Sequence, residues 1–381
     1  MKVHNPSPAS PTQLLQQLQR YIFQHDNTPL TPEQWQLLSP SIAAYGLERF
    51  FYYYANSSLP EALRTPFQTA YQFQAFQALK QEHALKQLKP LFQQPRIRFC
   101  PLKGVDRAYR LYPAPALRPM GDIDLLIHPE DCQAARAVLA EAGWQAEYDY
   151  AHQHHYSVIL KDGIALEIHF RLPRFIAADM LQVWALLLPV DSTEHRLPPE
   201  LNLLLLFNHA GGHHWQNGRR LLLDTGFLLS RQPVDWPKLT QLAAQFRVFT
   251  PELLFAAFPD FYPAEYRPPA GAIAPELAAD FRQLVLHGVA FASRPHELLM
   301  SQPDRFSPAW WRKRIAGLRP LCTRFRHHIP PGHRGQVFRC YLKDCGIKLK
   351  YFWRFLSGSK DPVLRQYLKR QKRIADYLSR H

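Results

Sequence analysis

The stretch Gly121-Asp122-Ile123-Asp124-Leu125-Leu126-Ile127 decides the fold and indicates the chemistry of this chain. Its apolar residues, bounded by a glycine, predict a buried strand. Because side chains two residues apart share a strand face, Asp122 and Asp124 lie on the same face. Two like charges in that arrangement repel each other unless a cation is held between them. Carboxylate oxygens suit Mg²⁺ or Mn²⁺, so we expect one of these ions at the pair.

A second acidic strand is predicted downstream. Ala165-Leu166-Glu167-Ile168-His169-Phe170 alternates between apolar and polar residues, which places Glu167 and His169 on one face. If this strand lies beside the first, Glu167 completes a three-acid site with Asp122 and Asp124.

A turn upstream of the acids suits a phosphate group. Residues 99–104 run an apolar strand into Gly104, and 105–111 read as the start of a helix. Backbone N–H groups approach phosphate closely at a strand-to-helix turn that contains glycine, and Lys103 adds a positive charge there.

These features together resemble a known family of proteins. They look like the bacterial uncharacterised nucleotidyltransferase family of the DNA polymerase beta-like superfamily, over about Pro32 to Phe258. That family also has a helical N-terminal part and a helical segment after the sheet. The residues that carry the resemblance are Leu102-Lys103-Gly104, Arg118, the Gly121–Ile127 strand, His154-His155 and Leu166–His169, with Asn208-His209, His213-His214, Leu223-Asp224 and Asp235-Trp236 in the later helical segment.

The resemblance implies an α+β fold, with a nucleotidyltransferase-type mixed sheet flanked by helical N-terminal and C-terminal regions. It implies transfer of a nucleoside monophosphate from a nucleoside triphosphate to an unidentified acceptor. Asp122, Asp124 and Glu167 are then the catalytic and metal-binding acids, with Glu167 either on the nucleophile-side metal or acting as general base. The residues expected to contact nucleotide are Lys103, Gly104, Arg118 and His169.

Two of these nucleotide contacts have structural alternatives. Arg118 precedes a proline and so also suits a role in closing a turn, and His169 also suits a core position with a backbone hydrogen bond. The turn itself reads Gly104-Val105, where the superfamily usually has Gly-Ser or Gly-Gly. This departure favours a second hypothesis, in which the fold is degenerate and the chain is a non-catalytic RNA- or membrane-surface-binding protein.

Periodicity divides the chain into four parts. Helical spacing dominates before position 95, short apolar runs at 97–102, 123–127, 156–160 and 164–170 predict strands, and helical spacing returns from 197. A helix is expected at 129–143 and an irregular Pro-rich connection at 258–275. The predicted parts are a helical region at 1–95, a nucleotidyltransferase core at 96–195, a helical domain at 196–304 and a basic region at 305–381.

The basic region concentrates the charge of the chain. Residues 305–381 contain 20 Lys and Arg against three acids, whereas the rest is nearly neutral. Such segregation favours contact with a polyanion, either RNA or an anionic membrane surface, although a solvated helical face is the ordinary outcome. A toxin-like enzyme that adds nucleotides to tRNA is therefore an alternative within the same chemistry.

Other classes of protein are disfavoured. Five cysteines without a CxxC pair argue against a disulfide framework or a ribbon-type zinc site, so free thiols are expected. The apolar runs are too short to span a membrane and the N-terminus lacks a signal pattern, so a cytoplasmic location is expected, with peripheral membrane contact left open. Histidine groups without a HExxH motif are not assigned to zinc; they are His152, His154 and His155, and His209, His213 and His214.

Overall fold

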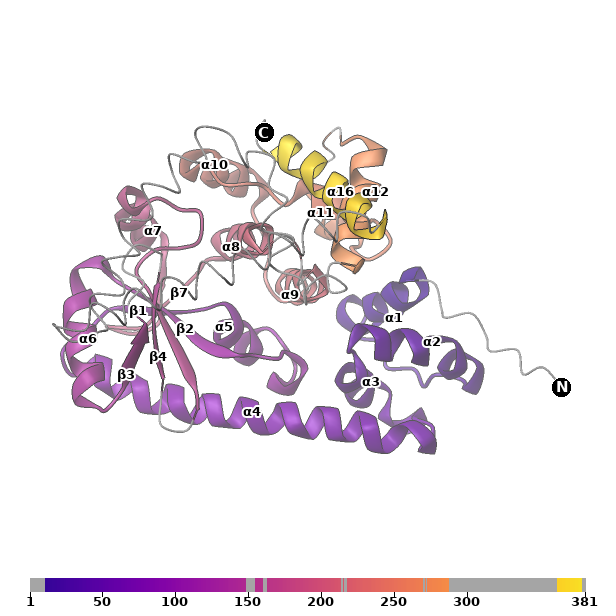
Figure 1. Cartoon of the computed structure of the whole chain (residues 1–381), viewed down its shortest axis with the longest axis horizontal. Helices are drawn as coiled ribbons and strands as arrows, with labels where there is room; N and C mark the ends of the chain where they lie inside the picture. The colour runs from indigo at the N-terminus through magenta and orange to yellow at the C-terminus, as the bar shows by residue number, and fades with distance from the viewer. Residues whose placement is uncertain are drawn as a thin grey trace, which may run out of the picture. The chain divides into compact units, whose positions relative to one another are not determined.

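The computed structural model of the chain describes residues 11–148, 155–159, 163–213, 215, 218–269, 271, 273–287 and 362–378 (Figure 1). These residues belong to two compact units, and each is described by itself. The first lies within Met1–His213 and Arg219–Ile273, and the second within His214–Gly218 and Ala274–His381. The four-part division predicted from the sequence stays a prediction.

Helices make up most of the described chain. No helix among the described residues combines the length and the apolar character needed to cross a membrane. The helices are α1 (Pro11–Phe23), α2 (Pro32–Tyr45), α3 (Glu48–Ala55), α4 (Glu61–Gln93), α5 (Lys103–Arg110), α6 (Cys132–Glu141), α7 (Met180–Leu186), α8 (Pro199–Gly212), α9 (Gly218–Arg231), α10 (Trp236–Phe246), α11 (Glu252–Ala257), α12 (Pro275–His287) and α16 (Pro362–Leu378).

The start of α2 shows how local sequence sets a helix boundary. Thr31 forms a capping box with Gln34, each side chain bonding the other residue's backbone, and a proline occupies the first turn. Gly46 ends the helix in the left-handed conformation, with φ 63°. The helix therefore begins at Pro32, directly after its cap.

The long helix α4 lies along the lower edge of the view in Figure 1. In its second half Ala84, Leu88 and Phe92 are buried in the core of the sheet. Phe73 and Phe76, which precede these residues on the same helix, are exposed, at 62% and 60%.

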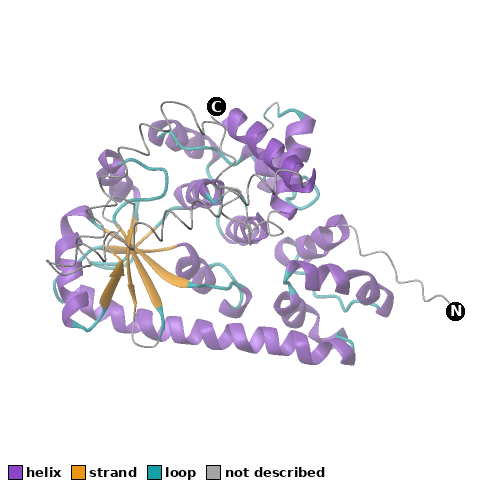
Figure 2. Cartoon of the chain, viewed as in Figure 1, coloured by secondary structure: helices purple, strands orange, loops and turns teal. Residues whose placement is uncertain are grey.

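The central sheet has five strands in the order β1-β2-β5-β4-β3 (Figure 2). β2 pairs with β5 in parallel, and every other pairing is antiparallel, so the sheet is mixed and the predicted α+β class is confirmed. Strand β3 was not predicted, because its sequence Gln-Ala-Glu-Tyr offers no apolar run. The strands are β1 (Phe99–Leu102), β2 (Asp122–Ile127), β3 (Gln145–Tyr148), β4 (His155–Ile159) and β5 (Ala165–His169), with a separate pair β6 (Leu188–Pro189) and β7 (His195–Arg196).

The core packs against one face of this sheet. Ile123, Leu125 and Ile127 of β2 point into a cluster with residues of α4 and α6. Because strand side chains alternate, Asp122 and Asp124 point to the opposite face. Burial of the apolar set thus fixes which face carries the acids.

A buried polar network connects α5, α8 and α9 on the first unit. Asp224 of α9 accepts hydrogen bonds from Arg118 Nε and Nη2, at 3.1 and 2.9 Å, and from the Tyr112 hydroxyl at 2.7 Å. Arg107 Nη1 lies 3.7 Å from the same carboxylate. Arg107 also donates to Asn202 of α8, with its Nη2 at 2.8 Å. Arg118 and Arg107 hold the pKa of Asp224 below its ordinary value, although burial opposes them.

The second unit contains α12 and α16. Asp280 of α12 pairs with Arg370 and Arg373 of α16, at 3.2 and 2.6 Å, and Tyr367 and Ile374 of α16 are buried. Most of the predicted basic region, residues 305–361 and 379–381, lies outside the described residues.

We expect Asp224→Ala to lower the free energy of unfolding by about 3–5 kcal/mol, because it leaves two buried guanidinium groups without their carboxylate. Asp235→Ala, which removes only the side-chain cap of α10, should cost about 1 kcal/mol. Urea unfolding of both variants measures the difference, and equal losses would contradict the importance of the network.

Candidate functional site

Two acids meet across the parallel pairing of β2 and β5. Asp124 lies directly opposite Glu167 in this pairing, and Asp122 precedes it on the same strand face. Asp124 is buried, at 1% exposure, whereas Asp122 and Glu167 are partly exposed. The structure therefore brings the predicted acids together on two neighbouring strands.

Lys103 comes to these acids from the junction of β1 and α5. Leu102 is paired with Asp124, so the next residue begins beside the acids. Lys103 Nζ lies 2.7 Å from Asp124 Oδ1 and 3.6 Å from Glu167 Oε2. Its backbone has φ 48°, in the left-handed region that few lysines adopt. Burial opposes the charge on Lys103, but Asp124 and Glu167 outweigh it and raise the lysine pKa.

His169 completes this cluster from the end of β5. Its Nε2 lies 2.7 Å from Asp124 Oδ1, 3.5 Å from Glu167 Oε2 and 3.4 Å from Lys103 Nζ. The ring is fully buried. The shared face predicted for Glu167 and His169 is thus observed, and His169 contacts side chains of the acid cluster.

The pKa values of the two aspartates of β2 are shifted in opposite directions. Burial would raise the pKa of Asp124, but Lys103 and His169 together hold it well below its ordinary value. For Asp122, burial, followed by the charges of Asp124 and Glu167, outweighs the opposing effect of Lys103 and His169 and raises the pKa to about 6. The cluster therefore holds more negative charge than its own cation neutralises.

The donor set fits a divalent cation. One ligand atom each from Asp124, Glu167 and His169 lie within 4.8 Å of one another. Two carboxylates suit Mg²⁺ or Mn²⁺, and the imidazole adds a donor that transition metals favour. Asp122, predicted as a ligand, is not part of this compact group and acts on it through its charge.

Gly104 is required by close packing behind the turn. A Cβ atom at this position would lie 2.8 Å from Arg118 Nη1 and 3.0 Å from Met120 Cγ. Arg118 itself is buried, with Nε and Nη2 on Asp224 and Nη1 donating to the Pro119 carbonyl. All three nitrogens of its guanidinium therefore have acceptors within the protein, and its contact with nucleotide stays a prediction.

His209 of α8 and His213, which directly follows this helix, also belong to the surroundings of the acids, although no role was predicted for them from the sequence. The His209 and His213 rings lie 4.5 Å apart, one turn from each other at the end of the helix. Burial, then the charge of Lys103, lowers the pKa of His209 well below its ordinary value, and the same two causes lower the pKa of His213. Both imidazoles are therefore neutral near pH 7. Their i, i+4 spacing in the sequence predicts that the two histidines share a helix face. It does not predict that this face lies near Asp122, which is far away along the chain.

Comparison with known proteins identifies one family. A family model described as "Uncharacterised nucleotidyltransferase" matches residues 31–260, more than half of the chain. This range agrees with the resemblance predicted from Pro32 to Phe258 and contains the whole acid cluster. No curated protein and no solved structure matches the chain.

We expect Asp122→Asn to raise the free energy of unfolding in the presence of EDTA, which removes divalent cations. The gain should appear only above about pH 4. In the unfolded chain this carboxyl has its ordinary pKa of about 3.9, whereas in the folded protein its pKa is about 6. As the pH rises between these two values, ionisation of Asp122 progressively lowers the free energy of unfolding of the wild type. The variant should gain about 1–3 kcal/mol near pH 7 and nothing below about pH 4.

Urea unfolding across this pH range measures the effect, with Glu141→Gln, at an exposed carboxylate of α6, as the matched control. A gain in the free energy of unfolding that does not depend on pH would show that the ionised form of Asp122 is not disfavoured in the folded protein.

Proposed function

The chain belongs to the uncharacterised nucleotidyltransferase family, and from this premise we propose that Asp122, Asp124 and Glu167 form a site that transfers a nucleoside monophosphate to an acceptor. The observation that carries the proposal is the pairing of Asp124 with Glu167 across parallel strands, beside a lysine and a glycine turn. The substrate expected for such a family is a nucleoside triphosphate.

A divalent cation is the cofactor that this donor set favours, with Mg²⁺ or Mn²⁺ proposed. Asp124, Glu167 and His169 would hold it, with Asp122 adding negative charge. When bound, such an ion neutralises phosphate oxygens and stabilises the charge that develops during phosphoryl transfer.

The residues of the turn would bind the phosphates. Lys103 is the cation nearest to the acids, and its flexible side chain reaches an incoming phosphate without a change in the backbone. Gly104 follows it near the start of α5, where a side chain is excluded. Backbone N–H groups in the first turn of a helix are donors that suit an anion. We propose these two residues as the principal phosphate contacts, with Arg118 holding the turn from behind.

The acceptor loses a proton during the transfer. Its oxygen forms a bond to the α-phosphorus, the bond from that phosphorus to pyrophosphate breaks, and the hydroxyl proton passes to a base. Glu167 is partly exposed and lies at the edge of the cluster, so we propose it as that base. His213, which follows α8, is exposed, and its lowered pKa keeps it neutral. It is the second group suited to take the proton.

The nature of the acceptor stays open, and an RNA or anionic surface contact through the basic region is part of the proposal. In α16, Lys369 and Lys372 are exposed, whereas Arg370 and Arg373 are engaged by Asp280. The exposed lysines are the described part of that region that suits contact with phosphate groups.

The proposal is tested by nucleotide binding with Asp122→Asn. One nucleoside triphosphate with Mg²⁺ should stabilise the wild type, by about 2.7 kcal/mol at one hundred times its dissociation constant, and EDTA should abolish the effect. Asp122→Asn should lose most of this stabilisation and at least about a hundredfold in pyrophosphate release, while its own stability is not reduced.

This combination separates lost binding from lost folding. Glu141→Gln is the matched control and should behave as the wild type. If none of the four triphosphates stabilises the wild type with Mg²⁺ or Mn²⁺, the enzymatic proposal fails and a non-catalytic role for the fold is favoured.

Metal binding is expected to displace Lys103 from the acids. The ammonium lies within the group of atoms that would bind the ion, so the two cations compete for Asp124 and Glu167. Lys103→Met should therefore bind Mn²⁺ at least about tenfold more tightly than the wild type, while its affinity for triphosphate falls.

Titration followed by the electron paramagnetic resonance of free Mn²⁺ measures this affinity without any assay of activity. Lys238→Met removes a lysine that pairs with Glu200 at 3.2 Å and serves as the control. Unchanged or weaker Mn²⁺ binding by Lys103→Met would show that the lysine does not occupy the metal position.

A further inference from the structure

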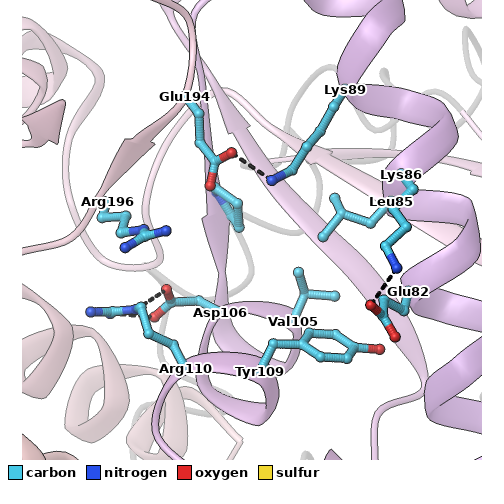
Figure 3. Close-up of a pocket in the computed structure, with 11 residues that line it drawn as sticks. Glu82, Leu85, Lys86, Lys89, Val105, Asp106, Tyr109, Arg110, Glu194 and Arg196 are labelled. Atoms are coloured by element: carbon cyan, nitrogen blue, oxygen red, sulfur yellow. Dashed lines mark hydrogen bonds and ion pairs between the residues drawn. The ribbon is translucent and has the colours of Figure 1, made fainter. Parts of the chain in front are cut away.

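A cavity lies on the side of the sheet away from the acids. It has a volume of about 240 Å³ and is lined by residues of α4, α5 and the segment around β7 (Figure 3). Pro101 of β1 lines it and is paired with Leu125, whose side chain belongs to the core face of β2. Because side chains alternate along β2, Asp124 points to the other face. A molecule in this cavity is therefore not the substrate of the acid cluster.

The charges around the cavity are unequal. Each of its three acids is engaged by a cation from the cavity wall: Glu82 by Lys86 at 2.6 Å, Glu194 by Lys89 at 2.7 Å and Asp106 by Arg110 at 2.8 Å. These pairs use every acid that lines the cavity.

Arg196 is the fourth cation of the cavity wall. It is half-buried, and among the residues that the structure describes no acid forms an ion pair with it. Figure 3 shows its side chain at the cavity, with no dashed line to a neighbour. A partly buried guanidinium favours an anion at this point, because its desolvation is otherwise uncompensated.

The cationic part of the wall is held in place before any ligand arrives. Asp106 is buried and accepts from Asn202 Nδ2 at 3.1 Å as well as from Arg110 Nε and Nη2. Arg110 is thereby fixed, and its Nη1 makes no hydrogen bond to a described residue. Two guanidinium groups thus flank the cavity, one of them already oriented, which lowers the entropy cost of binding an oxyanion.

The rest of the wall is apolar. Leu85 and Val105 line the cavity together with the ring of Tyr109, whose hydroxyl already donates to the Ala78 carbonyl. An apolar body attached to the anionic group would bury surface against these side chains.

We propose that this cavity is a second ligand site, which takes a small organic anion with one carboxylate or phosphate group on an apolar body. Arg196 binds the oxyanion, Arg110 assists it, and Leu85, Val105 and Tyr109 contact the apolar part. The site is independent of the acid cluster, so its existence does not depend on the nucleotidyltransferase activity.

The test uses phenyl phosphate and benzoate as probes, with benzyl alcohol as the neutral counterpart, in calorimetric titrations of the full chain. At least one of the two anions should bind at millimolar concentration with one site per chain, and benzyl alcohol should bind at least about tenfold more weakly. The comparison of the two anions shows whether phosphate or carboxylate is preferred.

Variants then locate the binding. Arg196→Gln should weaken it at least about tenfold, and Arg196→Lys, which keeps the charge, should weaken it less. Arg231→Gln, at an exposed arginine of α9, and Lys103→Met, at the acid cluster, should bind as the wild type does. Thermal unfolding of each variant confirms that it is folded.

Three results would overturn the proposal. These are no binding of either anion to the wild type, binding that Arg196→Gln leaves unchanged in a folded protein, and binding that Lys103→Met abolishes.

Discussion

The parallel pairing of β2 with β5 is the constraint on which the site depends. Parallel neighbours need a crossover connection, and here α6, β3 and β4 provide it, so that β5 returns beside β2 with Glu167 opposite Asp124. On the other side of β2, the antiparallel register of β1 sets Leu102 opposite the same aspartate and delivers Lys103 to it. Two acids and a lysine, up to 64 residues apart in sequence, therefore meet at one point because two registers coincide there.

Asp124 and Asp224 are both buried, but their surroundings differ in charge balance. Asp224 is matched by Arg118, Arg107 and a tyrosine hydroxyl, and its environment is complete. Asp124 has Lys103 and His169, but Asp122 and Glu167 lie beside them and leave negative charge in excess. A balanced buried carboxylate is typical of a structural contact, whereas an unbalanced group of carboxylates is costly until a cation arrives. The free energy that the acid cluster costs in the free protein becomes available for binding a cation.

The acid strands were predictable, and the groups around them were not. Asp122, Asp124 and Glu167 belong to short predicted strands, and the face of each side chain follows from the two-residue period of a strand. His209 and His213 share the surroundings of Lys103 only because α8 packs there, and nothing in a helix-spaced pair of histidines says which other element it will face. Arg118 was predicted to contact phosphate because the sequence does not show which residue its guanidinium meets in the fold. Its partner Asp224 lies 106 positions later, and only the fold shows that this carboxylate engages the guanidinium.

The backbone of the turn at Lys103 and Gly104 is held by contacts on two sides. Behind it, Arg118 and Met120 lie so close to Gly104 that a Cβ atom has no room, and Arg118 is itself held by Asp224. In front of it, Asp124 and Glu167 attract the Lys103 ammonium, and the backbone of this lysine adopts a left-handed conformation. A backbone packed on both sides does not rearrange at low cost. We therefore propose that the long side chain of Lys103 is the part of the turn that moves, and that its rotation alone takes the positive charge from the acids to an incoming anion.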